Sequence, residues 1–534
     1  MRGSLDQILT WDFDRLTPGH GHAVRTDGSQ SLRQAWDFLS SEYFDEHSPD
    51  HERPAAVGHA GATQPGHTHT QPRSTRGARC FFDRAYTVNP VCTPTRCSIL
   101  TGEYPSRHGC FHVGTSLPEN YGPTVAHRFT EAGYSTSLIG KAHFQACKDP
   151  ASLESAPRVH DLDHFNNWHG PYFGFEHAEL VIGHTSEPHA AGMHYGAWLR
   201  ERGVDLETFF NIHDYDHYGP WSLPEELHGS AWVADRSIAA IDRAKGKPFF
   251  LWSSFQDPHN PYVTPEPWAS QYDAASMPAP IVPPDLDGHP EFYASLARGA
   301  FYGDDLQLQE KAWGDVKIRP DMGPDETRAL RAVYYGMVSL MDHHIGRILD
   351  RLEADGTIDD TVIVFASDHG DYLGDHGLWG KGLPTYEAMQ RVPFIVAHPD
   401  CQDRGQTSHA LQSLVDIEQS CLDAAGLVAC EESQGVSQKA AWIDPNCSVR
   451  DHCLVEFRPA QGPFKQKTYV TDQYKLVLYD TRDYGELYDL GVDPEQSRNL
   501  YDDAEYQSLK TELTAAHAAD EERADLVRER TAVA

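Results

Sequence analysis

Cys92 lies in a segment whose residue types suit nucleophilic chemistry on an anion. The segment runs NPVCTPTRCSILTG, from Asn89 to Gly102. Thr93-Pro94 favours a helix start, because threonine caps well and proline suits the first helical position. Cys92 would then lie at a helix N-terminus, where free N–H groups and the helix dipole attract anions, with Arg96 one turn later. Such surroundings favour a reactive thiolate.

Further polar side chains directly follow apolar runs. They are Lys141 and His143 after GYSTSLIG, His259 in the turn after KPFFLWSSF, and Asp368 and His369 after TVIVFAS. The carboxyl ends of neighbouring parallel strands meet at one edge of a sheet, and open sheets of this kind bind ligands there. Adjacent carboxylate and imidazole groups suit a divalent cation. We therefore expect these side chains to converge on one site.

The charge of the chain makes a cluster of cations informative. Asp and Glu number 79 against 44 Lys and Arg, a formal net charge of −35. This excess disfavours nucleic acids and anionic membranes as partners. An anionic substrate would need local cations, and Arg96, Lys141, Lys381 and His259 around Cys92 would supply them.

These motifs resemble those of type I sulfatases, in the alkaline phosphatase superfamily. Cys92-x-Pro94-x-Arg96, followed by Leu100-Thr101-Gly102, is similar to the sequence in which that family oxidises a cysteine to formylglycine, although Thr95 stands where serine is more usual. The signature G-Y-x-T…G-K-x-H matches Gly133 to His143. With a closing hairpin at Gly485 to Leu500, the resemblance covers about Cys80 to Leu500.

The resemblance implies a nucleophile and a metal site. Cys92 would become a hydrated aldehyde. One hydroxyl would attack sulfur and expel the alcohol, and loss of the proton of the other hydroxyl would then eject sulfate and restore the aldehyde. Asp368, His369 and residue 92 would hold a divalent metal ion. Calcium is the expected ion, with magnesium or manganese as alternatives.

The resemblance also gives roles to the remaining candidates. Lys141 and Lys381 would bind the sulfate group, and Lys381 would also contact the leaving group. His143 would hold the formylglycine hydroxyl. His259 would contact the transferred group and protonate the leaving oxygen. With Arg96, these complete the expected catalytic set.

The implied activity is that of an arylsulfatase-like sulfuric ester hydrolase, which cleaves a small anionic sulfate monoester and is matured by the formylglycine-generating enzyme. A phosphonate monoester or phosphodiester hydrolase is the alternative within the superfamily, since such enzymes share the formylglycine and often the Asp-His pair. A catalytically impaired relative that only binds ligands is a third interpretation. Loops rich in aromatics and His, at 160–194 and 214–221, would select the leaving group; the oligomeric state is open.

The elements that must position these residues predict an α/β fold. Apolar runs indicate strands at Ser135–Ile139, Pro248–Ser253, Thr361–Ala366 and Pro393–Ala397. Apolar steps of three and four from Leu330 to Leu352 predict a helix. The resemblance implies an alkaline-phosphatase-like sandwich with a large, mostly parallel central sheet flanked by helices. A smaller C-terminal α+β subdomain with a short antiparallel sheet would follow.

The chain divides into three parts on composition. Residues 1–77 are rich in His, Pro and Gly and predict a disordered, low-complexity segment. Residues 78–400 would form the catalytic domain, and 401–534 the C-terminal subdomain with a helix at 411–427 and a charged helical tail. Sulfatases normally begin with a strand that ends in paired acids, and no such strand is evident here; Asp12 and Asp14 are the nearest substitutes.

The sequence also shows no pattern typical of a targeting or membrane-spanning segment. No apolar region follows a basic start, so no secretory signal or transmembrane segment is expected and the cytoplasm is the expected location. The ten cysteines are scattered without a CxxC pair, which predicts mostly reduced, structural thiols.

Overall fold

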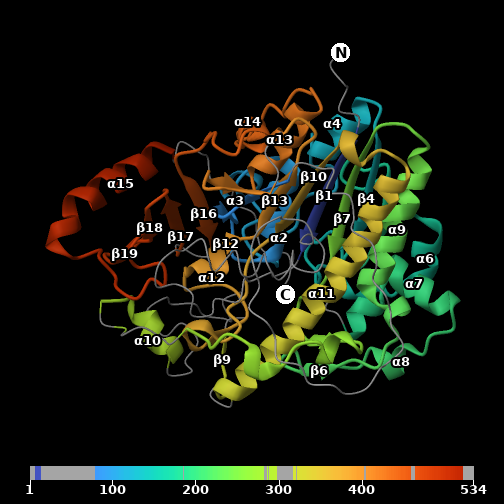
Figure 1. Cartoon of the computed structure of the whole chain (residues 1–534), viewed down its shortest axis with the longest axis horizontal. Coiled ribbons are helices and arrows are strands. Elements are labelled where there is room, and N and C mark those ends of the chain that lie inside the picture. The colour runs from blue at the N-terminus through green and yellow to red at the C-terminus, as the bar shows by residue number, and fades with distance from the viewer. Residues whose placement is uncertain are drawn as a thin grey trace, which may run out of the picture.

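An eight-stranded, mostly parallel sheet forms the centre of the molecule (Figure 1). The computed structural model describes residues 7–13, 79–183, 186–281, 286, 288–297, 317–319, 322–401, 405–458 and 464–520. The order across the sheet is β14 (Gln406–Ser408), β2 (Arg79–Phe82), β13 (Phe394–Ala397), β10 (Thr361–Ser367), β1 (Gln7–Phe13), β7 (Phe249–Phe255), β4 (Ser135–Gly140) and β5 (His177–Leu180).

The five strands from β10 to β5 run parallel to one another, so their carboxyl ends meet at one edge. β13 is antiparallel to both β10 and β2. The candidate residues Lys141, His259 and Asp368 follow β4, β7 and β10 at that shared edge. The fold thus supplies the convergence that the sequence pattern predicts.

The central strands β7 and β10 alternate their apolar side chains between two layers. In β10, Val362, Val364 and Ala366 pack into one layer. Ile363 and Phe365 pack into the other. Both faces of the sheet are covered by helices, which explains why β7 and β10 are mostly apolar rather than half polar.

The helices on the two faces come from different parts of the chain. One face is covered by α2 (Cys92–Thr101), α4 (Val125–Glu131), α13 (Asp416–Ala424) and α14 (Lys439–Ile443). The other is covered chiefly by α9 (Gly229–Ala244) and the long α11 (Pro324–Ala354), which lie side by side in Figure 1. α11 confirms the helix predicted around Leu330–Leu352.

Shorter elements connect these layers. The helices are α3 (Pro105–His108), α5 (Ala156–Val159), α6 (Leu162–Asn167), α7 (Met193–Glu201), α8 (Leu206–Phe209), α10 (Glu291–Ala297) and α12 (Glu387–Gln390). The strands are β3 (Ala85–Tyr86), β6 (Tyr218–Pro220), β8 (Tyr262–Thr264), β9 (Lys317–Ile318), β11 (Leu378–Trp379), β12 (Arg391–Val392) and β15 (Gln412–Ser413).

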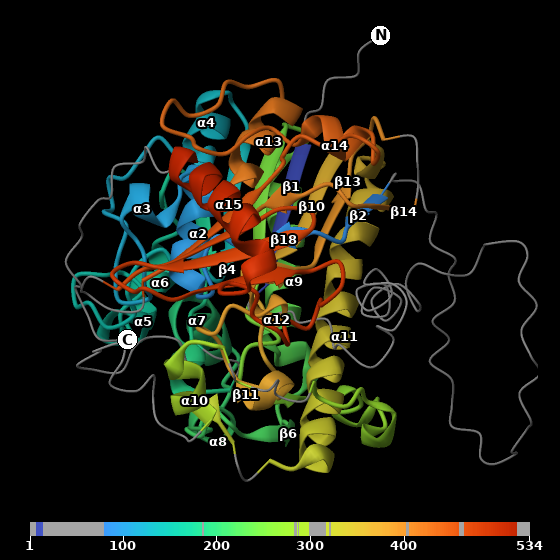
Figure 2. The ribbon, with the colours of Figure 1, turned by 90° about the vertical axis from the view of Figure 1, so that its left-hand side faces the viewer.

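A second, antiparallel sheet follows in the C-terminal part of the chain. Its order is β16 (Cys453–Phe457), β17 (Gln466–Val470), β18 (Tyr474–Tyr479) and β19 (Gly485–Asp489). α15 (Gln507–Asp520) lies across this sheet in Figure 2, where Leu513 packs with Leu476 and Leu487. This sheet confirms the predicted antiparallel unit. Of the predicted charged helical tail, residues 507–520 form α15, and residues 521–534 lie outside the described residues.

Two sequence predictions need correction. The helix expected over 411–427 is confined to α13, because residues 412 and 413 form β15 and pair with β3. The second correction concerns residues 1–77, where no strand was expected. β1 lies there and pairs along its whole length with β10 and β7 in the middle of the sheet, so it is a central strand. Residues 1–6 and 14–78 lie outside the described residues.

Within the residues that the structure describes, no helix combines the length and apolar character that crossing a bilayer requires. All ten cysteines lie in the described parts of the chain and none forms a disulfide, which agrees with the expectation of free thiols.

Candidate active site

Cys92 is the first residue of α2 and is fully buried. The cap residue is Val91, with φ −140° and ψ 157°, so the helix begins two residues earlier than Thr93-Pro94 indicates. Gly102 ends the helix with φ +70°, as the Thr101-Gly102 pair suggests. The position at a helix N-terminus is confirmed, and with it the favourable field for an anion.

Two side chains from distant parts of the chain reach the Cys92 sulfur. The Lys381 Nζ donates to Sγ at 2.9 Å. The His369 Nε2 lies 3.2 Å from the same sulfur. The His369 Nδ1 is 2.8 Å from the Gly370 carbonyl oxygen. If Nδ1 carries the proton and donates it there, Nε2 keeps its lone pair toward residue 92.

The three expected metal ligands lie close enough to share one ion. One atom each of Cys92, Asp368 and His369 falls within a mutual distance of 4.8 Å, and all three residues are buried. The Asp368 Oδ1 lies 3.7 Å from the His369 Nε2. Calcium, magnesium and manganese prefer oxygen ligands such as the carboxylate. Other transition metals favour nitrogen ligands such as the imidazole. The donor set fits a divalent ion.

Arg96 joins the ends of three strands through one buried guanidinium. Its Nε donates to the Asp368 Oδ2 at 2.9 Å, and neither side chain is exposed to solvent. Its Nη1 donates to the Lys141 carbonyl oxygen at 2.9 Å and to the Ser254 Oγ at 2.8 Å. Asp368 follows β10, Lys141 follows β4, and Ser254 lies near the end of β7. Arg96 therefore fixes the geometry of the edge on which the site is built.

The loop after β4 carries Lys141 and His143 in a backbone path that requires glycine before it. Gly140 has φ +103°, and a Cβ there would lie 1.8 Å from the Ser254 carbonyl oxygen. Glu154 stabilises the loop, because its Oε1 accepts hydrogen bonds from the backbone N–H groups of Phe144 and Gln145 at 3.0 and 3.3 Å. Lys141 is 2% exposed and His143 9% exposed.

Cys147 belongs to the same neighbourhood, and no local sequence pattern marks it. Its Sγ lies 3.4 Å from the His143 Nε2. Burial, together with the negative charge of Glu154, raises the pKa of the Cys147 thiol to about 12, against the opposing effect of the positive charge of Lys141. The Cys147 sulfur therefore contacts one of the candidate residues directly.

His259 lies in a buried turn after β7. Its Nδ1 is 2.7 Å from the Asn260 carbonyl oxygen, and the side chain is 1% exposed. The Asn260 Nδ2 donates to the Tyr215 carbonyl oxygen at 2.9 Å and ties the turn to the loop at 214–221. His259 shares the sheet edge with the other candidates, and its Nδ1 contact is with its own turn.

The acidic and imidazole groups after Gly370 serve the local structure. The Asp371 Oδ2 accepts from the Tyr262 hydroxyl at 3.0 Å. Asp375 forms a buried ion pair with Arg331 at 2.6 Å, and burial raises the pKa of Asp375. The His376 ring stacks on Tyr386 at 3.6 Å. These contacts stabilise the loop that follows β10.

Sequence reasoning missed the groups that position the candidates. Ser254 and Glu154 are examples, and Thr87 is another. The Thr87 Oγ1 donates to the Asp368 carbonyl oxygen at 2.6 Å and lies 3.0 Å from the Thr95 hydroxyl, which ties β10 to α2. The polar end of the otherwise apolar β7, Ser253-Ser254, was the one available signal for Ser254.

Comparisons with known proteins agree with this geometry. The family model described as Sulfatase matches residues 61–427. A second model, described as N-sulphoglucosamine sulphohydrolase, C-terminal, matches residues 374–522. An arylsulfatase of Clostridium perfringens is 28% identical over 444 residues, which cover 80% of this chain and 83% of that protein.

Two further similarities concern the wider superfamily. A multifunctional alkaline phosphatase superfamily protein of Trinickia caryophylli is 26% identical, over 82% of this chain and 86% of that protein. The solved structure of a phosphonate monoester hydrolase from Silicibacter pomeroyi superposes with a TM-score of 0.70 at 23% identity, covering 98% of this chain and 96% of that one. The latter similarity establishes the fold, which is the alkaline-phosphatase-like fold expected from the motifs.

Proposed function

Because the chain belongs to the sulfatase family and is a hydrolase of sulfate esters, we propose that Cys92, oxidised to formylglycine, is its nucleophile. The observation that carries this proposal is the convergence of Lys381, His369 and the N-terminus of α2 on the Cys92 sulfur. Formylglycine supplies a hydrated aldehyde that attacks sulfur and releases sulfate without leaving a stable ester. The Cys92 sulfur marks where the oxygens of that group would lie.

The metal site of this proposal consists of Asp368 and His369 together with residue 92. When bound, a divalent ion stabilises negative charge on the nucleophile and on the sulfuryl oxygens. Asp368 is oriented by Arg96, and His369 by the Gly370 carbonyl oxygen, so both ligands are held before an ion arrives. Calcium is our proposed ion, on family resemblance, with magnesium and manganese as alternatives.

The backbone of Asp12 in β1 stands in register with Ala366 of β10 and with Ser254 of β7. The proposed metal ligands remain Asp368, His369 and residue 92.

Cationic side chains bind the sulfate group. Lys141 and Lys381 neutralise its charge, and Lys381 also contacts the leaving group. Preorganised donors in a buried site stabilise developing charge more than they would in water, because water need not reorganise. His143 holds the hydroxyl of formylglycine, and His259 protonates the leaving oxygen. The substrate is a small anionic sulfate monoester.

Maturation and activity at Cys92 can be tested together. The formylglycine-generating enzyme is the proposed partner, so the chain should be produced with that enzyme and the peptide containing residue 92 analysed by mass spectrometry. An aldehyde at residue 92 is expected, with hydrolysis of an aryl sulfate. Cys92→Ala should abolish both. Cys97→Ala, a buried cysteine on the same helix, should retain both. An unmodified thiol together with no hydrolysis would contradict the proposal.

A second activity is favoured by one observation, the phosphonate monoester hydrolase fold at a TM-score of 0.70. The same cluster of cations and metal ligands would accept a phosphonate monoester or phosphodiester. Paired kinetics on an aryl sulfate and an aryl phosphonate ester with one leaving group decide between the two. We expect the larger kcat/KM on the sulfate; a larger value on the phosphonate would favour the alternative.

A further inference from the structure

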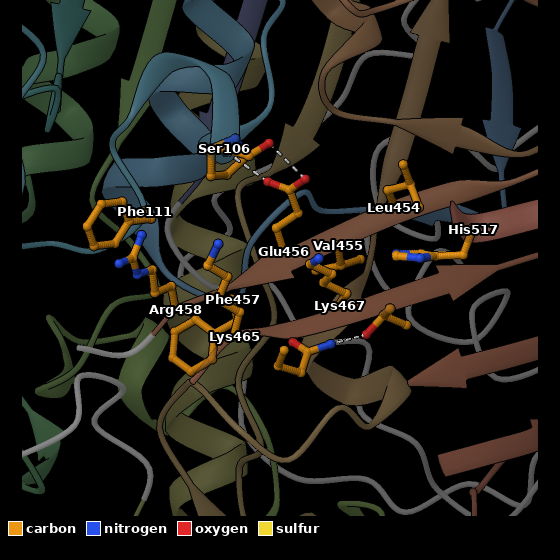
Figure 3. Close-up of a pocket in the computed structure, with 13 residues that line it drawn as sticks. Ser106, Phe111, Leu454, Val455, Glu456, Phe457, Arg458, Lys465, Lys467 and His517 are labelled. Atoms are coloured by element: carbon orange, nitrogen blue, oxygen red, sulfur yellow. Dashed lines mark hydrogen bonds between the residues drawn. The ribbon is translucent and has the colours of Figure 1, made fainter. Parts of the chain in front are cut away.

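His169, His177 and Glu179 form a cluster outside the candidate active site, at the outer edge of the central sheet. One possible ligand atom of each residue lies within 4.8 Å of those of the other two. β5, which carries His177 and Glu179, is the last strand in the sheet order and contacts α7. In Figure 1, α6 and α7 lie at the opposite end from the C-terminal sheet. The cluster is therefore separate from the pocket in Figure 3, which lies between α3, β16 and β17.

The geometry of β5 places His177 and Glu179 on the same face of the strand. Successive side chains of a strand point to opposite faces, so residues two apart share one. Ala178 and Leu180 pack into the apolar layer that α2 and α4 cover. The His177 Nε2 and the Glu179 Oε1 are 2.9 Å apart. At zinc bond lengths of about 2.0 Å, two tetrahedral ligands lie about 3.3 Å apart, so this pair needs to open only slightly to share an ion.

A backbone hydrogen bond brings His169 to this pair. The Ala178 N–H, between the two strand residues, donates to the His169 carbonyl oxygen at 2.8 Å. Gly170 follows with φ +115°, and a Cβ there would lie 2.8 Å from the Glu176 carbonyl oxygen, so glycine allows the chain to turn back onto β5. The His169 ring stacks on the His177 ring, with 5.3 Å between centres and 11° between planes. The backbone thus holds the three residues together, and side-chain rotations would bring their donor atoms onto one ion.

His194 of α7 packs against the cluster and positions it. Its Nδ1 accepts from the Leu180 N–H at 2.8 Å, and its Nε2 lies 2.8 Å from the Trp168 carbonyl oxygen. Burial lowers the pKa of His194 to about 4, so the ring is neutral near pH 7 and its Nε2 proton is donated to Trp168. The His194 ring lies 5.0 Å from the His169 ring. Both nitrogens of His194 are therefore used by the fold, and the ring supports His169.

The protonation states of the cluster suit a metal ion. Burial lowers the pKa of His169, which favours the neutral imidazole that binds metals. Burial alone would raise the pKa of Glu179, but the hydrogen bond from His177 and the positive charge of Arg236 outweigh it. The pKa of Glu179 is thereby lowered, and the carboxylate is ionised near pH 7.

Two arginines of α9 share the Glu179 carboxylate without enclosing it. Arg243 lies 3.4 Å from Oε1, and Arg236 lies 3.7 Å from Oε2. Their side chains are 38% and 35% exposed, and solvent screens pairs of this kind. The arginines oppose a cation, but this screening limits the repulsion. The two imidazoles remain on the other side of the competition as ligands that an arginine cannot replace.

We propose that His169, His177 and Glu179 form a second metal site, which binds a divalent transition metal ion and zinc above all. Two imidazoles with a carboxylate are a ligand set that zinc uses, with its fourth position left to water, whereas calcium and magnesium prefer oxygen ligands throughout. On binding, the proton between His177 and Glu179 passes to solvent, because both ligand atoms must be unprotonated. The ion joins the segment after α6 to the outer strand of the sheet.

Zinc binding can be measured without turnover. The parent and the variants are titrated with zinc in competition with a chromophoric chelator, and bound metal is counted by elemental analysis. The catalytic ligands are intact in every variant, so an ion held there contributes equally to all. His169→Gln should lower the affinity of the second site by at least about tenfold, since even groups behind a metal ligand contribute about 10–100-fold. Glu179→Gln should lower it likewise.

His213→Ala removes an exposed histidine elsewhere and should leave zinc binding unchanged. Unfolding without metal checks the fold: His169→Gln should match the parent, and added zinc should raise the parent's midpoint by more than the variant's. Equal zinc content and affinity in the parent, His169→Gln and Glu179→Gln would overturn the proposal, whatever the catalytic activity. An equal loss of zinc in His213→Ala would also overturn it, because exposed histidines in general would then account for the bound ion.

Discussion

The Arg96 guanidinium and the Asp368 carboxylate form an ion pair from which solvent is wholly excluded, with 2.9 Å between Nε and Oδ2. A buried pair of this kind contributes little net stability, because the desolvation of both ions offsets their attraction. Its effect here is positional. Arg96 also bonds the Ser254 hydroxyl and the Lys141 carbonyl oxygen, so the carboxylate is fixed relative to β7 and β4.

Asp368→Asn should therefore lower both the free energy of unfolding and the amount of bound divalent ion. Removing one partner leaves an uncompensated buried charge, at a cost of about 3–5 kcal/mol in the free energy of unfolding. Loss of a carboxylate ligand should also reduce the bound divalent ion, measured by elemental analysis after dialysis.

The chain offers a matched control in Asp375→Asn, which breaks another buried arginine pair, Arg331–Asp375 at 2.6 Å. That variant should lose a comparable free energy of unfolding in denaturant titrations while it keeps its metal. If the two variants bind equal amounts of metal, Asp368 is a structural acid and the proposed ligand set is wrong.

Lys381→Ala tests the contact with residue 92. The ammonium group lies 2.9 Å from Sγ and would stabilise charge that develops on the nucleophile and the sulfate group. Loss of one such preorganised donor costs roughly 10²–10³ in kcat. Lys381→Arg should rescue little of it, because the planar guanidinium cannot replace a compact ammonium charge. Steady-state kinetics on an aryl sulfate give both values, and near-parental kcat in Lys381→Ala would exclude the role.

His259→Ala should separate substrates by their leaving groups. An alkyl alkoxide needs a proton in the transition state, whereas 4-nitrophenolate leaves readily without one. General acid catalysis contributes roughly 10²–10⁴, so kcat on an alkyl sulfate should fall by that order and kcat on 4-nitrophenyl sulfate far less. His213→Ala, an exposed histidine outside the loops expected to select the leaving group, is the control. Equal losses on both esters would point to a positioning role for His259.

Sequence patterns pointed to the candidate site residues more readily than to the groups that position them. Cys92, Asp368 and Lys141 each lie at the end of an element with a clear local signature, a capped helix start or an apolar strand. Arg96 and Asp368 are 272 residues apart, and nothing local says that they touch. The same holds for Glu154, whose partners are backbone N–H groups.

β1 was not predicted from the sequence, for a related reason. Its sequence, QILTWDF, mixes polar and apolar residues and lies within a polar segment, so no local pattern marks it. Its pairing with β10 and β7 supplies hydrogen bonds on both sides, which only the tertiary structure reveals. The domain boundaries at residues 77 and 400 stay predictions, although β14 and α13 pack on the central sheet after residue 400.

Glu154 makes stability depend on pH. Burial raises the pKa of Glu154 from 4.5 to about 7, while Tyr172 and the backbone N–H groups of Phe144 and Gln145 oppose the rise. Since the folded chain binds this proton more tightly than the unfolded chain, the stabilisation is complete below pH 4.5 and is lost as pH rises through about 7. A shift of this size corresponds to about 3 kcal/mol.

Glu154→Gln, which cannot ionise, should flatten that decline. Denaturant unfolding of the parent and the variant at a series of pH values from 4.5 to 8 measures it, and the difference between the two profiles isolates Glu154 from the many histidines that titrate in the same window. Glu201→Gln, an exposed glutamate at the end of α7, should leave the profile unchanged. A parental slope in Glu154→Gln would mean that the carboxylate stays ionised under the Lys141–His143 loop throughout, held by the backbone donors against the effect of burial.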